Sequence, residues 1–187
     1  MRQQNQSRNY AIGLTVLSAL GRLIPHAPNV TPLGGSCLFA GSRISGWLAY
    51  LLPLAVMIVT DPMVGSAGGA HGGYTSASPL IYAAFLINVW LGRRLVRQVT
   101  ATRVGGAAFV CSLQFFLLTN LAVWFRGAEG AAHMYALNLT GLLACYAAAL
   151  PFWGRTLAGD LLFSGALFGM YALLSRRQVE VSNQIAV

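Results

Sequence analysis

Residues able to take part in chemistry are few in this chain, and they lie beside its apolar stretches. Only four of the 187 residues are acidic, and two of these, Asp61 and Asp160, adjoin apolar runs. Ionisable groups are costly in apolar surroundings, where they usually mark a binding site or a conduction path. We therefore predict a ligand site built from polar and aromatic side chains. Its predicted contacts are Asn29, Asp61, Asn120, Trp124, Tyr146, Arg155 and Asp160.

Each of these residues also has a structural interpretation that needs no ligand. Asp160 is placed to cap a final helix or to pair with Arg155. Asn120 lies inside an apolar segment, where an amide commonly forms a hydrogen bond between helices. Trp124 and Tyr146 are equally typical of the aromatic belt at a membrane surface. The residue types alone leave both interpretations open.

No catalytic or metal-binding pattern is present in the sequence. It lacks the G-x-S-x-G nucleophile turn, the H-E-x-x-H zinc pattern and the P-loop that binds nucleotide phosphates. Its three histidines, His26, His71 and His133, fall in expected loops and have no ligand spacing, and its three cysteines lie in apolar segments. We therefore expect no enzyme activity, no cofactor and no metal site.

The composition is that of an integral membrane protein. Hydrophobic residues make up 56% of the chain and charged residues 9%, whereas soluble domains carry about 25% charged residues. Several apolar runs approach the ~18–20 residues that cross a bilayer. The net charge of +8 comes from arginines at the ends of apolar segments, a pattern of membrane insertion rather than of nucleic-acid binding. We predict a single all-α transmembrane domain, residues 1–187.

Six membrane spans are expected in this domain, the second of them short or broken. They are predicted at about 10–25, 32–43, 45–60, 79–95, 106–125 and 157–175. A further apolar stretch, about 134–150, is placed against the outer face, and "PFWGRTLAGD" after it predicts a break in the chain. This arrangement leaves most arginines and both termini on the cytoplasmic side, as positive charges prefer. If 134–150 crossed instead, the pair Arg176 and Arg177 would move outside.

Small residues recur every four positions in the first span. Ala11, Thr15 and Ala19 share one helix face, which would let another helix approach closely. That helix belongs either to a partner subunit or to this same chain.

The sequence "RLIPHAPNVTPLGG", residues 22–35, joins the first two spans. Its three prolines restrict the backbone and remove N–H donors that would be costly near lipid. A plain turn needs fewer prolines. We predict a stiff connector at the outer face that forms one wall of the ligand site, with a purely architectural role as the alternative.

Two resemblances bear on the fold and function. The stretches "GRLIPHAPNVTPLGGSCLFAG", "LLPLAVMIVTDPMVG", "FLLTNLAVWF" and "TGLLACYAAALPFWGRTLAGDLLFSGALFG" resemble, in this order, an uncharacterised family of small bacterial membrane proteins. The stretch "LPFWGRTLAGDLLFSGAL" is also similar to the block before the last helix of biotin-type S components. These are the substrate-binding subunits of energy-coupling factor (ECF) vitamin transporters. The segment "WGRTLAGD" is longer than theirs and lacks their following lysine, so biotin specificity does not carry over.

The S-component resemblance implies a particular way of working. Such subunits have six helices with both ends cytoplasmic, bind substrate near the outer face, and dock on a coupling subunit through small residues of the first helix. Ala11, Thr15 and Ala19 match that pattern. We therefore expect a substrate-binding subunit in the bacterial inner membrane that captures a small nutrient or vitamin-like molecule and works with separate coupling and ATPase subunits. The alternative is a non-catalytic accessory subunit of a larger respiratory or photosynthetic membrane complex.

Overall fold

The computed structural model describes residues 2–24, 27–66, 74, 77–126 and 134–185. These residues form six α-helices and a short 3-10 turn, and no strand occurs among them, as predicted for an all-α chain. The elements are α1 (Arg2–Leu20), η1 (Gly21–Leu23), α2 (Leu33–Arg43), α3 (Leu48–Ser66), α4 (Ser78–Leu95), α5 (Ala101–Arg126) and α6 (Leu139–Ile185).

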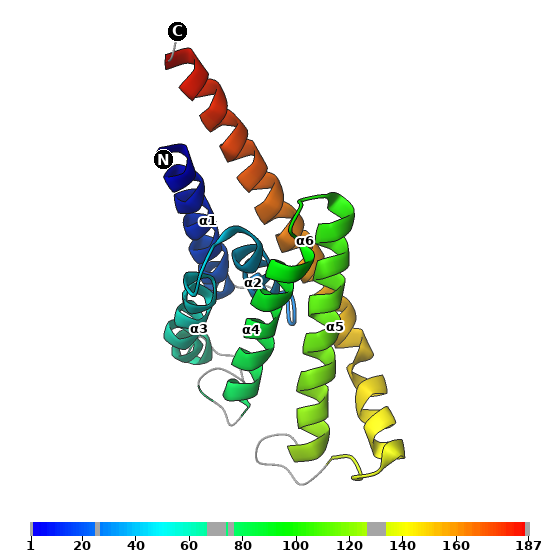
Figure 1. Ribbon diagram of the computed structural model, residues 1–187. Coiled ribbons are helices and arrows are strands. Elements are labelled where there is room, and N and C mark those ends of the chain that lie inside the picture. The colour runs from blue at the N-terminus through cyan, green and yellow to red at the C-terminus, as the bar shows by residue number, and fades with distance from the viewer. Residues whose placement is uncertain (1, 25–26, 67–73, 75–76, 127–133, 186–187) are drawn as a thin grey trace.

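The helices give the molecule two distinct ends. Figure 1 shows the start of α1 and the end of α6 together at one end, which we call the terminal end. At the other, which we call the distal end, α3 and α5 finish and α4 begins. The helices α3, α4, α5 and α6 thus run alternately away from and toward the terminal end.

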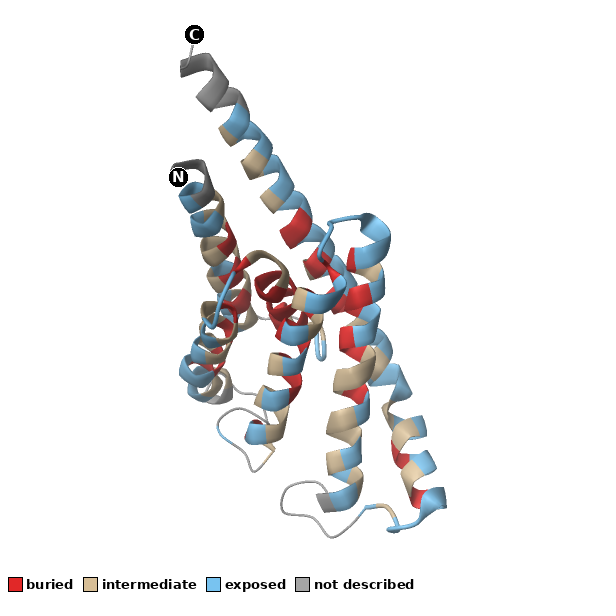
Figure 2. Ribbon diagram, in the orientation of Figure 1, coloured by how far each residue is buried: buried red, intermediate tan, exposed pale blue. Residues whose placement is uncertain are grey.

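Two helices are long and apolar enough to cross a membrane. The qualifying segments are Ala101–Phe125 of α5 and Leu139–Val179 of α6, and α3 contains a shorter apolar stretch, Leu48–Val64. Exposed residues, pale blue in Figure 2, occur along the long helices. They include large apolar side chains such as Phe125, 65% exposed, and Leu162, 64% exposed. Exposed apolar surface of this kind is typical of contact with lipid or protein rather than water.

The last helix corrects the prediction of a break after residue 150. α6 runs without interruption for 47 residues and contains Pro151 in its interior. At a rise of 1.5 Å per residue its length is about 70 Å. The stretch 134–150 is therefore not a separate outer helix, because from Leu139 onward it forms the first part of the same helix that contains the predicted final span. The first predicted span, 10–25, also differs, since α1 already ends at Leu20.

Contacts with α5 explain why Pro151 does not end α6. A proline removes one backbone donor from the helix and crowds the preceding turn. Here the ring of Phe116 on α5 lies 5.4 Å from Tyr146, before the proline, and 5.3 Å from Trp153, after it. The Trp153 indole also donates a hydrogen bond to Ser112 Oγ at 3.1 Å. α5 thus supports α6 on both sides of the proline.

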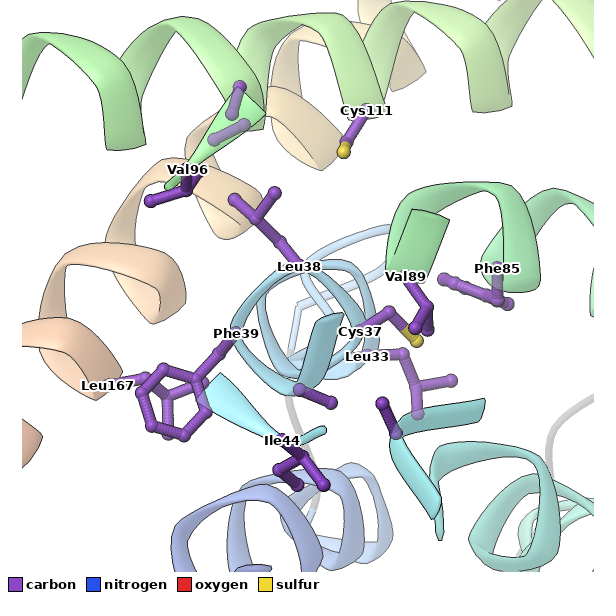
Figure 3. Packing of buried hydrophobic residues seen from close by; sticks show 14 of the residues in the cluster. Leu33, Cys37, Leu38, Phe39, Ile44, Phe85, Val89, Val96, Cys111 and Leu167 are labelled. Atoms are coloured by element: carbon purple, nitrogen blue, oxygen red, sulfur yellow. The ribbon is translucent and has the colours of Figure 1, made fainter. Parts of the chain in front are cut away.

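The short helix α2 is the centre of the fold. Residues Leu33–Gly41 are all buried, and Figure 3 looks along this helix, with α4, α5 and α6 around it. At the crossing with α4, a Cβ on Gly41 would overlap the Val89 carbonyl, and a Cβ on Gly92 would overlap the Leu38 carbonyl. Two glycines therefore allow the backbones of α2 and α4 to touch.

α2 begins at the level of the middle of α6. Gly34 in its first turn lies against Asp160, and further along Phe39 packs edge-on against Phe168 with ring centroids 5.1 Å apart. Because the contacts advance together along both helices, α2 and α6 run in the same direction. α2 therefore leads from the interior of the molecule toward the terminal end.

The small-residue stripe of α1 packs inside this chain. Ala11, Thr15 and Ala19 are each 0% exposed, and α1 contacts α2, α3 and α6. The prediction that this stripe docks on a partner helix is therefore wrong for the chain as folded, because no surface of these residues remains for a partner. The alternative of packing within the chain is the one the structure shows.

Candidate functional site

An ion pair joins the turn after α1 to α3 and α4. Arg22 Nη1 of η1 donates to Asp61 Oδ1 at 2.6 Å and to Thr60 Oγ1 at 3.2 Å. The Tyr82 hydroxyl of α4 donates to the other carboxylate oxygen, Asp61 Oδ2. The side chains of Arg22 and Asp61 are only 17% and 12% exposed. Asp61, predicted as a ligand contact, therefore holds the turn after α1 in place.

The second predicted carboxylate, Asp160, lies in the interior. It is 3% exposed and sits beside Gly34 at the start of α2. The first N–H groups of a helix lack partners within the helix and carry partial positive charge, which favours a carboxylate there. Ser112 of α5 lies beside Asp160, and Ser112 accepts the Trp153 indole N–H. Polar side chains of α5 and α6 thus meet beside the start of α2.

Three predicted ligand contacts lie along the seam between α5 and α6, toward the distal end. Asn120 Nδ2 donates to the Phe116 carbonyl at 2.8 Å within its own helix. Trp124 Nε1 donates to the Ala136 carbonyl at 2.9 Å, and the Tyr146 hydroxyl donates to the Leu117 carbonyl at 2.8 Å. Each of these polar atoms satisfies a backbone group. Tyr146 thereby fastens α6 to α5, and Trp124 fastens α5 to the chain before α6, whereas the Asn120 bond stays within α5.

The remaining two predicted contacts, Asn29 and Arg155, are exposed. Arg155 lies in the middle of α6 rather than in a connector, which corrects its predicted place, and it does not pair with Asp160, since the ion pair formed in the described part of the chain is Arg22–Asp61. Asn29 has a backbone φ of 66°, in the left-handed region that asparagine tolerates better than most residues. It therefore marks a tight reversal of the chain.

The segment between η1 and α2, residues 24–32, is hereafter the connector; its residues 25 and 26 lie outside the described part of the chain. The connector packs on the middle of α6, where Val30 contacts Gly159. Gly159 stands 20 residues after Leu139 and 20 before Val179, the limits of the apolar part of α6. The connector therefore lies beside the middle of α6 and not beside either of its ends.

A cleft opens between the distal halves of α4 and α5, hereafter the α4–α5 cleft. Its volume is about 620 Å³, within the range of small-molecule sites in proteins. The walls are apolar, and its lining residues are Pro79, Leu80, Ala83, Leu118, Leu121, Ala122 and Phe125. A molecule held here would contact mainly hydrocarbon and one aromatic ring.

A polar contact closes the α4–α5 cleft one helical turn farther from the distal end. Gln114 Nε2 of α5 donates to Asn88 Oδ1 at 2.7 Å and to the Ala84 carbonyl at 2.9 Å, both on α4. Amide pairs of this kind are common between membrane helices. This contact ties α4 to α5. The cleft lies between this contact and the distal end.

Sequence reasoning missed the lining of the α4–α5 cleft. Its residues on each helix recur at spacings of three and four, as for Leu118, Leu121, Ala122 and Phe125, and this spacing places them on one helix face. The same spacing is typical of any apolar face that contacts lipid or core. The pattern was therefore visible, but nothing in it distinguished a cleft from an ordinary surface.

The described residues include no cluster of metal ligands. No group of three histidine, cysteine or acidic side chains among them is arranged to hold a metal ion. The three histidines named above lie outside the described residues. The arrangement provides an apolar cleft, a fixed ion pair near it and a group of polar side chains in the interior.

Comparisons with known proteins were made for the whole chain. Neither the curated proteins nor the solved structures gave a match. The sequence model of one family, described as a family of unknown function (DUF6580), matches residues 2–183. That match spans nearly the entire chain, from the start of α1 to the last turn of α6, and so the protein belongs to the DUF6580 family.

Proposed function

We propose that this protein is a six-span membrane protein that captures a small nutrient-like molecule from outside a bacterial cell. In this proposal it resembles the S component of an ECF transporter, and it passes its substrate on with the help of separate coupling and ATPase subunits. Embedding in a membrane is supported by the two helices of sufficient length and by the exposed apolar side chains between the ends of the molecule.

The distribution of arginine supports an orientation with both termini in the cytoplasm. Arg93 and Arg94 end α4, Arg103 begins α5, and Arg176 and Arg177 lie in the last part of α6. All of these positions are at the terminal end of the molecule (Figure 1). Because positive charge is retained on the cytoplasmic side during insertion, the distal end with the α4–α5 cleft would face outward.

The depth of the connector is the observation that carries the proposal. Irregular backbone within a bilayer is tolerated only where protein buries it or where it borders a water-filled cavity. The connector reaches the middle of α6 at Gly159, yet Ala27, Pro28 and Asn29 are exposed. If α6 spans the bilayer, we expect water rather than lipid to reach these connector residues, through an outward-facing vestibule.

In this proposal the connector forms the polar, water-accessible part of the binding site, and the α4–α5 cleft forms its apolar part. It opens at the same, distal end and is lined by apolar residues and Phe125. An apolar cleft with few polar groups suits a ring-containing or amphipathic molecule of modest size. We therefore assign the substrate to the α4–α5 cleft, with its polar part directed to the vestibule.

One feature of S components has no counterpart in this fold. Their small residues on the first helix dock on the coupling subunit, whereas Ala11, Thr15 and Ala19 are buried here. A coupling subunit would therefore have to bind another face. The proposal accordingly rests on the connector and the α4–α5 cleft and not on this stripe.

Purification of the intact protein in mild detergent tests the proposal. We expect a copurifying small molecule, identified by mass spectrometry, that is lost when Ala83→Trp fills the α4–α5 cleft. Ala158→Trp, on an exposed position of α6, is the matched control and should retain it. A preparation without any bound small molecule would contradict the proposal, and a stoichiometric redox complex would instead support the accessory-subunit alternative.

A further inference from the structure

A second cavity lies at the terminal end of the molecule, far from the α4–α5 cleft. It has a volume of about 450 Å³ and is formed where the start of α1, the end of α2 and the last part of α6 meet. Its lining residues are Asn5, Ser7, Arg8, Arg43, Ser45 and Tyr171. Unlike the α4–α5 cleft, this terminal pocket is lined by side chains that carry hydrogen-bond donors.

The guanidinium of Arg43 is fixed in the wall of the terminal pocket. Its Nε donates to Ser42 Oγ at 3.0 Å, and its Nη2 donates to the Val96 carbonyl at 3.3 Å. The Tyr171 ring lies 6.0 Å from the guanidinium carbon. These contacts orient the positive group without neutralising it, because none of the partners is a carboxylate.

The loop that carries Ser45 is also held in place. Arg93 Nη2 of α4 donates to the Gly46 carbonyl at 2.7 Å and to the Ile44 carbonyl at 3.3 Å. Arg93 additionally lies 5.1 Å from the ring of Tyr50. The side of the terminal pocket formed by this loop is therefore arranged before any ligand arrives.

Neither carboxylate whose side chain the structure describes lies in the terminal pocket. Asp61 pairs with Arg22 and joins η1 to α3, and Asp160 is buried beside Gly34. Arg8 and Arg43 thus bring two positive charges to one polar cavity, and neither forms an ion pair with a carboxylate whose side chain the structure describes. Such a cavity favours a compact anion that can accept several hydrogen bonds.

We propose that the terminal pocket binds a phosphate group. The guanidinium groups of Arg8 and Arg43 would neutralise it, and the hydroxyl groups of Ser7, Ser45 and Tyr171 would donate to its oxygens. Either the headgroup of an anionic lipid or free phosphate presents this chemistry. If the terminal end faces the cytoplasm, the anionic inner leaflet lies beside the pocket. The inference does not require the proposed substrate, since the two cavities lie at opposite ends.

Binding to the full-length protein in neutral detergent tests this inference. One probe is dioleoyl phosphatidylglycerol, compared with dioleoylglycerol, which has the same acyl chains and no phosphate. The other is inorganic phosphate, compared with chloride at equal ionic strength. Native mass spectrometry measures retained lipid, and the unfolding midpoint measures stabilisation by either probe. We expect the phosphate-bearing probe to bind and stabilise the protein, and its unphosphorylated or chloride counterpart not to.

Variants of exposed pocket residues make the test specific. Arg8→Gln should weaken binding by about ten- to a hundredfold, the effect of losing one charged hydrogen-bond donor, and Ser45→Glu should abolish binding through repulsion. Both positions are exposed, so unfolding midpoints without probe should match the wild type. Arg103→Gln removes an exposed charge at the same end without lining the pocket, and it should bind as the wild type does.

The two probes distinguish the sources of the phosphate group. Binding of phosphatidylglycerol alone identifies a lipid headgroup, and stabilisation by inorganic phosphate identifies a free anion; either result supports the site if Arg8→Gln weakens it. The inference is overturned if neither probe binds, if Arg8→Gln and Ser45→Glu bind normally, or if Arg103→Gln loses as much affinity. Loss of the copurifying substrate in Ala83→Trp would leave all these results unchanged.

Discussion

The carboxylate of Asp160 occupies the space that a side chain on Gly34 would need. Glycine at this position lets α6 bring a buried carboxylate against the first turn of α2, where unpaired N–H groups favour negative charge. α2 is therefore fixed at its beginning by Asp160 and near its end by the crossing of Gly41 with Val89. These contacts place the connector, which leads directly into α2.

Replacement of Gly34 by alanine should destabilise the protein. The added Cβ would meet the buried Asp160 carboxylate, which would have to shift. Overpacking of this kind costs about 1–3 kcal/mol. Reversible unfolding in detergent, by denaturant or by heat, measures the loss. Gly34→Ala with wild-type stability would show that α2 and α6 are not packed as described.

Gly165→Ala is the matched control for this substitution. Gly165 lies on α6 with no atom within 4 Å of a Cβ placed there. Alanine is favoured over glycine inside a helix by roughly 0.5–1 kcal/mol. We therefore expect Gly165→Ala to be as stable as the wild type or slightly more stable, which separates the effect of crowding from that of helix propensity.

The Arg22–Asp61 pair should stabilise the fold whether or not a ligand binds. Asp61→Asn removes the charge that Arg22 and Tyr82 both use, and it leaves Arg22 with little solvent access. Hydrogen bonds to charged groups contribute about 1.5–3 kcal/mol each, and a loss of that size is expected in unfolding experiments. Tyr82→Phe removes one of these bonds and should cost less.

A double-mutant cycle separates the pair from its surroundings. Once Arg22→Gln has removed the cation, Asp61→Asn should cost much less than it does in the wild type, because contacting residues do not behave additively. Equal costs in both backgrounds would show that the two side chains do not interact in solution.

The sequence predicts helix bounds well where prolines and arginines mark the two ends of a helix. The expected segments 32–43 and 79–95 differ from α2 and α4 by one residue at one end, because Pro32 and Pro79 mark helix starts and arginines mark their ends. The break predicted after residue 150 fails for a tertiary reason. Judged from the local sequence alone, a proline such as Pro151 is expected to kink or end a helix. The rings of Tyr146 and Trp153 pack on Phe116, which is distant in the sequence, and a local pattern cannot show these contacts.

The candidate site is less predictable than the helices. The apolar pattern predicts that Ala11 and Ala19 pack against a helix, yet it does not say which helix. Asn120 and Trp124 are polar groups near an expected site, but their backbone partners become visible only in the fold. The depth of the connector follows from the contact between Val30 and Gly159, residues that are 129 positions apart, and no local pattern records such a contact.

Continuity of α6 through Pro151 can be measured directly. Spin labels on cysteines introduced at Ala144 and Ala158, both exposed, lie on either side of the proline. Fourteen residues of unbroken helix separate their Cα atoms by about 21 Å. Electron paramagnetic resonance should give a single narrow distance distribution near this value once label length is included. A broad distribution, or a distance clearly shorter than that of a straight helix, would show that α6 is broken near Pro151, as the sequence predicts.

Water access to the connector tests the orientation and the vestibule together. Ala27→Cys, on the exposed connector, should react with a membrane-impermeant maleimide added outside intact cells. Ala158→Cys is the comparison. Ala158 is also exposed, and it neighbours Gly159, which contacts the connector. In the proposed arrangement its side chain faces lipid. Lipid should shield it, so that it stays unlabelled until the membrane is dissolved. The native Cys37, Cys111 and Cys145 are buried and should add little background.

Equal labelling of both positions would remove the reason for placing the connector within the bilayer. Labelling of Ala27→Cys only from the inside would reverse the proposed orientation.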